Sequence, residues 1–573
     1  MLTTLINKLK LLGLVGAVLS GLIATAPLAA PAKPKLVLQI TVDQLRGDLP
    51  LRYLDRFEDG GFRRLYRDGA VFFNAHHAHA NTETIVGHTT LATGAHPSEH
   101  GMVGNLWLDR STGKITYNIE DGRYRLLTED AGVSANDEID PTQRAARSEG
   151  RSPAAILVST ISDEIRLASQ GTAKSIAVSV KDRGAVAMAG HAGTAYWFSK
   201  TTGQFVTSNY YSEQYPQWVT AFNAESPTAR YGNQAWTLAG DIDNYLFGTQ
   251  DDQAWETDIG GFGRTFPHPY PAADNRYFTT LLTLSPAGDE LVIDFAKQAI
   301  IGEKLGRDDE TDYLSISLSS TDYVGHIFGP SSLEAEDNLL RLDQGLAALL
   351  DFVDREVDIE NTLVILSADH GAAEAPGTLT ALNIPAGYFD PDQIINHPYI
   401  EKLQSQYRLE SPIIASYTAP YIYLRQEVRR LPEQTRQALV SVLQAQLADL
   451  PGVASTVYSE AIARGQPGTD WLTQAVAHNF HPARSGDIYV VLEPHIFIND
   501  FDGLTVTATH GSPWSYDTHV PLIFAGWQVK PNSVYRRVDT VSVAPTLSQI
   551  LSIKSPSGAV GEPLTELLDN LPR

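Results

Sequence analysis

Short, uninterrupted apolar runs recur along the chain. The first covers residues 36–42 (Leu-Val-Leu-Gln-Ile-Thr-Val), and similar runs lie at 175–180, 313–318, 362–366, 488–492 and 522–525. Such runs of aliphatic and β-branched residues are typical of strands that are buried on both faces of a parallel sheet. The pattern therefore predicts a sheet built largely from parallel strands.

Helical patterns lie between several of these runs. The clearest follows Pro330, where Ser331 and Glu334 fit a capping box and an apolar stripe continues at Leu339, Leu342, Leu346, Leu349 and Val353. Strands that alternate with helices predict an α/β fold with a doubly wound, mainly parallel sheet. Ligands of such folds collect at the carboxyl ends of the strands.

Two stretches depart from this rhythm within a catalytic unit that we expect to cover residues 34–570. Residues 196–277 are rich in Trp, Tyr, Gly, Asn and Pro. They predict a loop-rich insertion that covers the site as a cap, or ordinary surface loops packed by aromatic side chains. Residues 412–497 contain strand-like and helical segments that predict a small β-α-β lobe.

The first thirty residues have the layout of a secretory signal peptide. Lys8 and Lys10 precede the apolar run 11–23, and small residues follow at 24–26 and 29–30. The apolar run is shorter than the roughly 20 residues that a membrane-spanning helix needs. We expect cleavage within this segment, no stable membrane insertion afterwards, and a periplasmic or secreted protein; an uncleaved N-terminal anchor is the alternative.

Composition excludes several kinds of chemistry. The 573 residues include no cysteine, so disulfides, thiolate metal ligands and cysteine nucleophiles are all absent. The formal net charge of −24 argues against binding to a nucleic-acid backbone, for which a basic face is expected. An anionic substrate would have to meet local positive charge, from metal ions or from a few Lys and Arg side chains.

A hydroxyl-rich stretch at residues 81–94 offers a nucleophile. If Thr84 begins a helix there, its hydroxyl lies beside unpaired backbone N–H groups at the positive end of the helix dipole. A hydroxyl is a poor nucleophile near neutral pH and needs a base or a metal ion to activate it. The alternative is that Thr82 or Thr84 serves only as an N-cap.

Acidic and histidine residues follow several of the predicted strands. Asp322 and His326 are four residues apart, so a helix would place both on one face as two ligands for a metal ion. The other members of this set are Asp43, Asp369, His370, His510 and His519. Aspartate and histidine without cysteine suit zinc, and with Thr84 there are enough ligands for two ions. Two ions can hold the attacking and leaving oxygens of an in-line displacement, which indicates phosphoryl transfer.

The order of the motifs resembles the alkaline phosphatase superfamily, most closely its threonine-nucleophile monoesterases of the PafA type. The resemblance covers nearly everything after residue 30. The motifs that carry it are 41–46 (TVDQLR), 84–88 (TIVGH), 101–105 (GMVGN), 180–184 (VKDRG), 320–326 (STDYVGH), 367–371 (SADHG), 509–512 (THGS) and 516–521 (YDTHVP).

This resemblance implies a role for each residue. One zinc is held by Asp43, Asp369 and His370 and also binds the Thr84 oxygen, and the other is held by Asp322, His326 and His510. His510 is preferred to His519 because a glycine follows it, and His519 is then a residue that orients a ligand. Asn105, Lys181 and Arg183 contact the phosphoryl oxygens that are not transferred.

The implied protein is an exported phosphomonoesterase with two zinc ions. It hydrolyses small phosphate monoesters through a phosphothreonine intermediate, and we expect it to act as a monomer. A nucleotide pyrophosphatase or phosphodiesterase of the same superfamily is the alternative enzyme, and the motif Lys181-Asp-Arg183 favours the monoesterase because a monoester carries the greater charge. A non-catalytic metal-binding surface protein is the alternative outside enzymes.

Overall fold

The computed structural model describes residues 33–134, 138–501 and 503–571, so the predicted signal peptide lies outside the described residues. A nine-stranded sheet forms the centre of the described chain, in the order β23-β2-β22-β12-β1-β11-β6-β7-β8. Its longest strands are β1 (Leu36–Val42), β6 (Ser175–Ser179), β7 (Thr194–Ser199), β11 (Asp312–Leu318), β12 (Thr362–Ser367) and β22 (Leu522–Gly526). Strands β12, β1, β11, β6 and β7 run parallel, while β22 runs antiparallel to β12. The predicted α/β fold with a mainly parallel sheet is confirmed.

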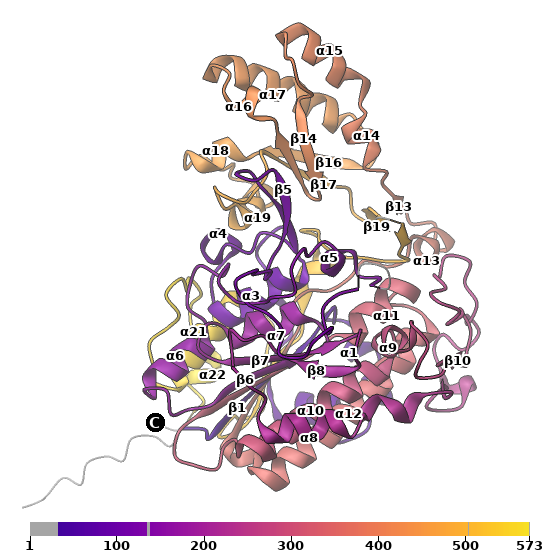
Figure 1. The fold of residues 1–573 in the computed structure, drawn as a ribbon, viewed down its shortest axis with the longest axis vertical. Helices are drawn as coiled ribbons and strands as arrows, with labels where there is room; N and C mark the ends of the chain where they lie inside the picture. The colour runs from indigo at the N-terminus through magenta and orange to yellow at the C-terminus, as the bar shows by residue number, and fades with distance from the viewer. Residues whose placement is uncertain (1–32, 135–137, 502, 572–573) are drawn as a thin grey trace, which may run out of the picture.

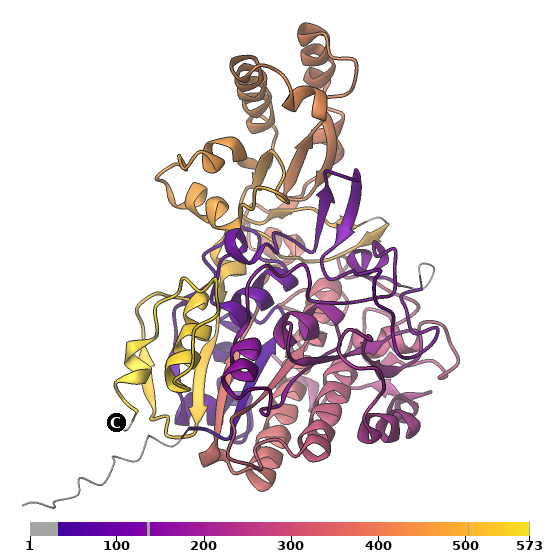
Figure 2. The same cartoon turned by 60° about the vertical axis from the view of Figure 1, so that its left-hand side comes forward.

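Helices cover both faces of this sheet (Figures 1 and 2). Alternate residues of β1 point to opposite sides, as the strand period requires. Leu36, Leu38 and Ile40 join a core cluster with helices α10 (Pro286–Glu303) and α12 (Leu333–Glu356), whereas Val37 joins a cluster with α6 (Ile161–Ala168) and α21 (Val543–Ile550). Every residue of β1 is consequently buried.

The long helix α12 confirms the predicted apolar stripe, since its five members at positions 339–353 are all buried. The predicted capping box is wrong. Ser332, one residue later, is the N-cap and accepts a hydrogen bond from the Ala335 N–H, while the Ser331 hydroxyl donates to Glu374. Glu334 is fully buried, and its carboxylate lies 3.2 Å from His268 Nε2, so tertiary packing decides its partner.

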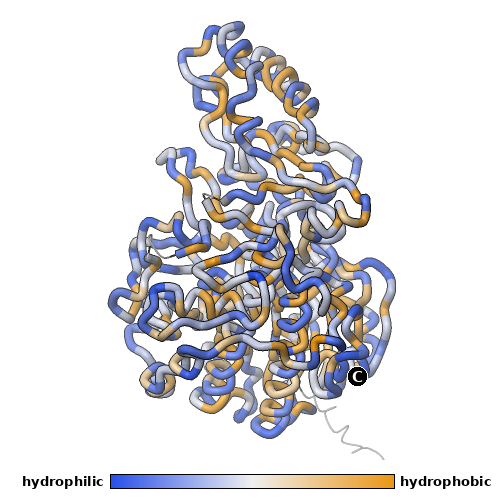
Figure 3. Tube along the Cα trace, turned by 90° about the vertical axis from the view of Figure 1, so that its right-hand side faces the viewer, coloured by the Kyte–Doolittle hydropathy of each residue, from blue (hydrophilic) through white to orange (hydrophobic). Residues whose placement is uncertain are grey.

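A lobe stands above the central body in Figure 1. Its four-stranded sheet has the order β14-β15-β17-β16 and contains β14 (Ile414–Thr418), β15 (Tyr421–Leu424), β16 (Val453–Tyr458) and β17 (Ile488–Leu492). All its pairings are antiparallel, and α17 (Glu433–Ala448) packs against it. The apolar run at 488–492 thus belongs to the lobe. Figure 3 shows apolar segments within the body and within the lobe.

The aromatic-rich stretch 196–277 begins inside the central sheet, because its first residues belong to β7 and β8 (Gln204–Val206). Later parts pack on the helices of one sheet face. The Trp218 indole donates to Glu303 of α10 at 2.7 Å, and the Trp236 indole donates to Asp337 of α12 at 2.6 Å. In the described ranges, no helix combines the length and apolarity needed to cross a membrane.

Candidate active site

Three neighbouring parallel strands bring the acidic residues together. Strand β1 lies between β11 and β12 in register, so residues that follow the three strands meet at one edge of the sheet. Asp43 follows β1, Asp369 follows β12, and Asp322 lies in helix α11 (Ser320–Phe328), which begins directly after β11. All three carboxyl groups are buried.

These residues form two overlapping groups of metal-ligand type. Asp322, His326 and His510 make one group, with both histidine Nε2 atoms near Asp322 Oδ1, at 3.2 Å and 3.4 Å. The other contains Asp43, Asp322 and His370, whose Nε2 lies 3.4 Å from Asp43 Oδ1. Asp322 is therefore common to both groups.

The histidine rings are oriented by backbone carbonyls. Because a carbonyl can only accept, each of the three rings donates its Nδ1–H, which in a neutral ring leaves the lone pair on Nε2. The pairs are His326 with Ala508 at 2.8 Å, His370 with Gly371 at 3.0 Å, and His510 with Thr82 at 2.7 Å. Burial also lowers the pKa of His370 well below its usual value, which keeps that ring neutral. Oriented neutral imidazoles of this kind are how proteins present histidine to metal ions.

The carboxyl groups differ in their electrostatics. Burial, followed by the nearby Asp369, raises the pKa of Asp43 well above its usual value. Burial alone would raise the pKa of Asp322. The nearby His326 and Lys181 outweigh this effect and hold the pKa well below its usual value. Positive charge beside Asp322 therefore stabilises its ionised carboxylate, as a bound cation would.

Several buried polar atoms here lack a hydrogen-bond partner of normal geometry. They are both carboxylate oxygens of Asp43, the Thr84 hydroxyl, Asp369 Oδ2 and His370 Nε2, although the Lys181 ammonium lies 2.7 Å from Asp43 Oδ2. Buried polar groups are normally satisfied. Oxygen and nitrogen donors left in this state suit zinc, so the residues fit a pair of metal ions.

Thr84 is the first residue of helix α3 (Thr84–Thr93), and Glu83 is the N-cap. The prediction that Thr84 starts a helix is confirmed, and neither Thr82 nor Thr84 is the N-cap. The Thr82 hydroxyl donates to the Ser512 carbonyl at 3.0 Å instead. Thr84 is 1% exposed, and its hydroxyl, on the first residue of the helix, has no hydrogen-bond partner.

A cavity of about 110 Å³, which we call the site cavity, joins Thr84 to other predicted site residues. Thr84, Asn105 and Arg183 line it together with Asp322, His326 and His510. The apolar residues that line it are Ile139, Pro141, Leu284, Ile327, Leu504 and Val506. Residues 139–142, 504 and 506 thus belong to its lining, and none of the residues that line it comes from the stretch 196–277.

The predicted phosphate-binding residues take different positions. Asn105 Oδ1 accepts from the Ile85 N–H at 3.2 Å, which leaves its amide nitrogen free to donate. The Arg183 guanidinium pairs with Asp140 at 3.0 Å, and its Nε has no partner. Lys181 lies deeper, fully buried, with its ammonium in contact with both Asp43 and Asp322.

His519 lies against a different part of the chain. Its Nε2 donates to the Phe73 carbonyl at 3.0 Å, and its ring stacks on His76. His510, in contrast, stacks on His370 with ring centres 3.5 Å apart. Of the two histidines considered for the metal site, the structure brings His510 into the cluster.

Sequence reasoning missed residues that position the predicted ones. Gln44 donates its amide N–H₂ to Asp322 at 2.8 Å and its backbone N–H to Asp369 at 3.2 Å. His88 Nδ1 lies 2.9 Å from the Thr84 carbonyl and 3.1 Å from Asp369 Oδ2. The helical spacing of Thr84 and His88 was a usable signal, since residues four apart share a helix face.

Comparison with known proteins agrees with this geometry. A family model described as type I phosphodiesterase / nucleotide pyrophosphatase matches residues 37–513. The chain belongs to this family, within the alkaline phosphatase superfamily. It lies in the PafA-type branch, and the predicted resemblance is confirmed.

Relatives match over nearly the whole chain. Alkaline phosphatase PafA of Elizabethkingia meningoseptica is 34% identical over 96% of this chain and 97% of its own. A calcium-transporting ATPase of Myroides odoratus is 35% identical over 94% of this chain and 95% of its own. The crystal structure of wild-type alkaline phosphatase PafA superposes with a TM-score of 0.83 at 33% identity, covering 94% of this chain and 99% of that one.

Proposed function

We propose that this protein is an exported phosphomonoesterase that uses two zinc ions and the Thr84 hydroxyl to release inorganic phosphate from phosphate monoesters. The observation that carries the proposal is the unpartnered Thr84 hydroxyl in one cavity with Arg183 and the ligand group of Asp322, His326 and His510. The full-length similarity to alkaline phosphatases supports the same activity. Export rests on the predicted signal peptide at residues 1–30, and we propose a monomer.

The ligand sets that we propose are those implied by the sequence. Asp43, Asp369 and His370 hold one ion beside Thr84, and the converging Nε2 atoms of His326 and His510 hold the other with Asp322. Bound divalent ions supply Lewis acidity, which favours the threonine alkoxide and stabilises charge on the departing oxygen. Gln44 and His88 keep Asp322 and Asp369 in place. His519 acts from outside the cluster.

Thr84 attacks phosphorus, and a phosphothreonine intermediate forms as the alcohol leaves on the opposite side. Asn105 and Arg183 donate to the phosphoryl oxygens that are not transferred, because an amide and a guanidinium match the charge and geometry of a phosphate dianion. Lys181, in contact with Asp43 and Asp322, adds positive charge beneath the site. A second attack, by water along the path of the departed alcohol, releases phosphate.

The substitution Thr84→Ala tests the nucleophile. We expect hydrolysis of p-nitrophenyl phosphate to fall below detection, while the metal content measured by mass spectrometry stays at about two zinc ions per chain. Thr89→Ala is the matched control, because Thr89 is a buried threonine of the same helix whose hydroxyl also lacks a partner. Full activity of the Thr84 variant would require a different nucleophile.

The substitution Arg183→Ala tests the choice of substrate. A monoester presents more charge and more free oxygens than a diester, so we expect kcat/KM for p-nitrophenyl phosphate to fall about 100-fold or more, as for loss of a charge-assisted contact in a transition state. The rate on bis-p-nitrophenyl phosphate should fall far less. Equal losses on the two substrates would contradict the proposed contact between Arg183 and the phosphoryl group.

The second candidate is a phosphodiesterase or nucleotide pyrophosphatase, which the matched family model favours by its description. The two activities share the metal ligands and the threonine. They are separated by the ratio of kcat/KM for p-nitrophenyl phosphate to that for its bis ester. A ratio above one supports the monoesterase, and a ratio below one supports the alternative.

A further inference from the structure

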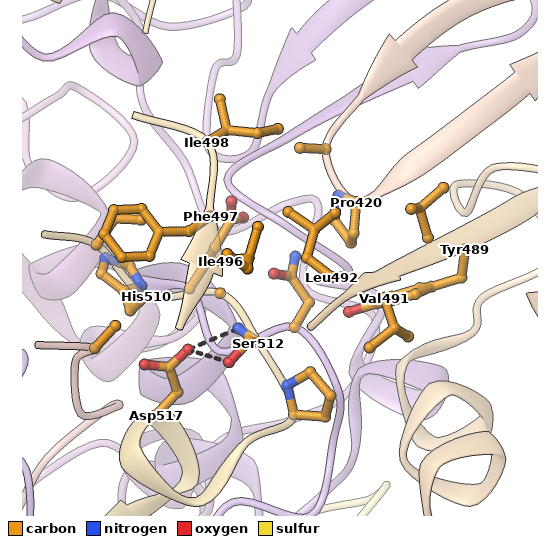
Figure 4. Close-up of a pocket in the computed structure, with 18 of the residues that line it drawn as sticks. Pro420, Tyr489, Val491, Leu492, Ile496, Phe497, Ile498, His510, Ser512 and Asp517 are labelled. Carbon is orange, nitrogen blue, oxygen red and sulfur yellow. Dashed lines mark hydrogen bonds between the residues drawn. The ribbon is translucent and has the colours of Figure 1, made fainter. Parts of the chain in front are cut away.

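A second cavity, of about 100 Å³, lies between the lobe and the segment that carries His510 (Figure 4). We call it the lobe pocket. Residues of the segments 489–498 and 509–517 supply most of its wall, and its apolar side chains include Pro420, Val491, Leu492, Ile496, Phe497 and Ile498. A cavity of this composition suits an apolar group.

The lobe pocket adjoins the site cavity. Glu83, Thr509 and His510 line both spaces, while Thr84 lines the site cavity alone. In an in-line displacement the leaving oxygen departs opposite the nucleophile. His510 belongs to the ligand group of Asp322 and His326, which is not the group that we assign to Thr84. The group attached to the leaving oxygen is therefore directed toward the side on which the lobe pocket lies.

The polar atoms of the lobe pocket have an acidic character. Tyr489 is 1% exposed, its hydroxyl has no partner, and in Figure 4 its ring extends toward the centre of the pocket. Asp517 is equally buried; one of its oxygens accepts from the Ser512 N–H at 2.9 Å and the other has no partner. Glu83 adds a further carboxyl group, and the residues that line the pocket include neither Lys nor Arg. The lining therefore offers no lysine or arginine that could pair with a second anionic group.

We propose that the lobe pocket binds the ester group of the substrate and selects monoesters of uncharged, mainly apolar alcohols, such as aryl-methyl alcohols, over those with a very small or a second anionic group. This inference rests on the proposed phosphomonoesterase function. Burial of a phenyl-sized group contributes roughly 1.5–3 kcal/mol, which corresponds to about tenfold to hundredfold in kcat/KM.

Benzyl phosphate and methyl phosphate test the proposal on the zinc-loaded wild-type enzyme. Their alcohols have similar acidity, so the intrinsic reactivity of the two esters is matched. We expect benzyl phosphate to have the larger kcat/KM by about tenfold or more. Benzylphosphonate should also inhibit more tightly than methylphosphonate by a comparable factor. Ratios near one in both measurements would overturn the proposal without any variant.

The substitution Ile496→Trp fills the pocket. Ile496 is half-buried, which leaves freedom for a larger ring, and it is not among the residues that line the site cavity. We expect the benzyl-to-methyl ratio to fall about tenfold while methyl phosphate turnover stays within about twofold of the wild type. Ile301→Trp is the control, because Ile301 is 48% exposed on helix α10. An unchanged benzyl-to-methyl ratio in a folded Ile496→Trp variant would refute the proposal.

4-Carboxybenzyl phosphate tests the charge argument. Its extra carboxylate should lower kcat/KM about tenfold relative to benzyl phosphate in the wild type, and much less in Ile496→Trp, where the group is already excluded. Equal kcat/KM values for benzyl phosphate and 4-carboxybenzyl phosphate would contradict the electrostatic part of the proposal. Absence of hydrolysis of every monoester, p-nitrophenyl phosphate included, would instead refute the proposed function itself.

Discussion

The position of Arg183 depends on one carboxylate. Asp140 is 6% exposed, lines the site cavity and pairs with the guanidinium at 3.0 Å, and it also accepts from the Tyr323 hydroxyl at 3.2 Å. A negative charge beside a phosphate site is unfavourable by itself. Asp140 instead positions Arg183. Its carboxylate fixes one edge of the guanidinium and leaves Nε free to contact the substrate.

We therefore expect Asp140→Asn to lower kcat/KM for p-nitrophenyl phosphate about tenfold, with little change for the bis ester. Asparagine retains an oxygen that can accept from the Thr142 N–H, as Asp140 does at 3.0 Å, so the local turn should persist. Metal content should stay at the wild-type level. An unchanged monoester rate, or an equal loss on both esters, would show that Asp140 does not position Arg183.

At the residue scale, spacing and chain order predicted much of the site. Asp322 and His326 were predicted as a pair from helical spacing alone, and they lie on one helix with Nε2 and Oδ1 3.2 Å apart. Asp140 could not be predicted, because its contact with Arg183 joins residues 43 positions apart through a loop without periodicity. Such contacts are set by tertiary packing, which a local pattern does not record.

Helix α3, which begins at Thr84, packs on the backbone of Asp369 through a glycine. A Cβ atom on Gly87 would lie 1.9 Å from the Asp369 carbonyl oxygen and 2.7 Å from its Cα. Both are backbone atoms, so the helix and the strand end would have to move apart. The close approach of Thr84 to the Asp369 side of the site therefore requires glycine at this position.

We expect Gly87→Ala to lower the Tm by a few degrees and the phosphatase rate by about tenfold or more. Alanine would favour an isolated helix by roughly 0.5–1 kcal/mol, but overpacking a buried contact costs about 1–3 kcal/mol, so destabilisation should prevail. Gly122→Ala is the control, since its added Cβ would meet only Ser148 at ordinary contact distance. Wild-type Tm and activity in the Gly87 variant would disprove this account of helix placement.

At the element scale, the strands of the central sheet were predicted because a strand buried on both faces must be apolar throughout. The run at 488–492 looks the same, yet it belongs to the lobe. Sequence alone does not separate the lobe strand from the strands of the central sheet, because helices or loops pack on both sheets and both kinds of strand are therefore apolar. The cap of α12 was misplaced by one residue, since Ser331 and Ser332 are chemically equivalent and the partner Glu374 decides which one turns toward the helix.

The stability of the whole molecule should depend on pH through a buried acid far from the surface. Asp289 in helix α10 is 4% exposed, and burial raises its pKa to about 7. Its Oδ1 accepts from the Ser320 N–H at 3.0 Å, and Oδ2 has no partner. The unfolded chain ionises this group near its usual pKa of about 3.9.

Because the folded-state pKa is raised, the native state binds the extra proton between about pH 4 and pH 7, and stability falls as pH rises through this window. At roughly 1.4 kcal/mol per pKa unit, the decline amounts to a few kcal/mol. We expect Asp289→Asn to match the wild-type Tm near pH 4 and to exceed it at pH 8. A Tm difference that is the same at both pH values would contradict this.

Asp322 belongs to both ligand groups of the site. We assign Asp322 as a ligand of one ion, but its carboxylate also lies within reach of the Asp43 and His370 group. Two cations this close to one carboxylate cannot fill independently, because each alters the charge that the other meets. Titration of the metal-free protein should consequently give a binding isotherm that two independent sites do not fit. Replacement of Asp322 should weaken the retention of both ions together, whereas replacement of His326 should mainly release one.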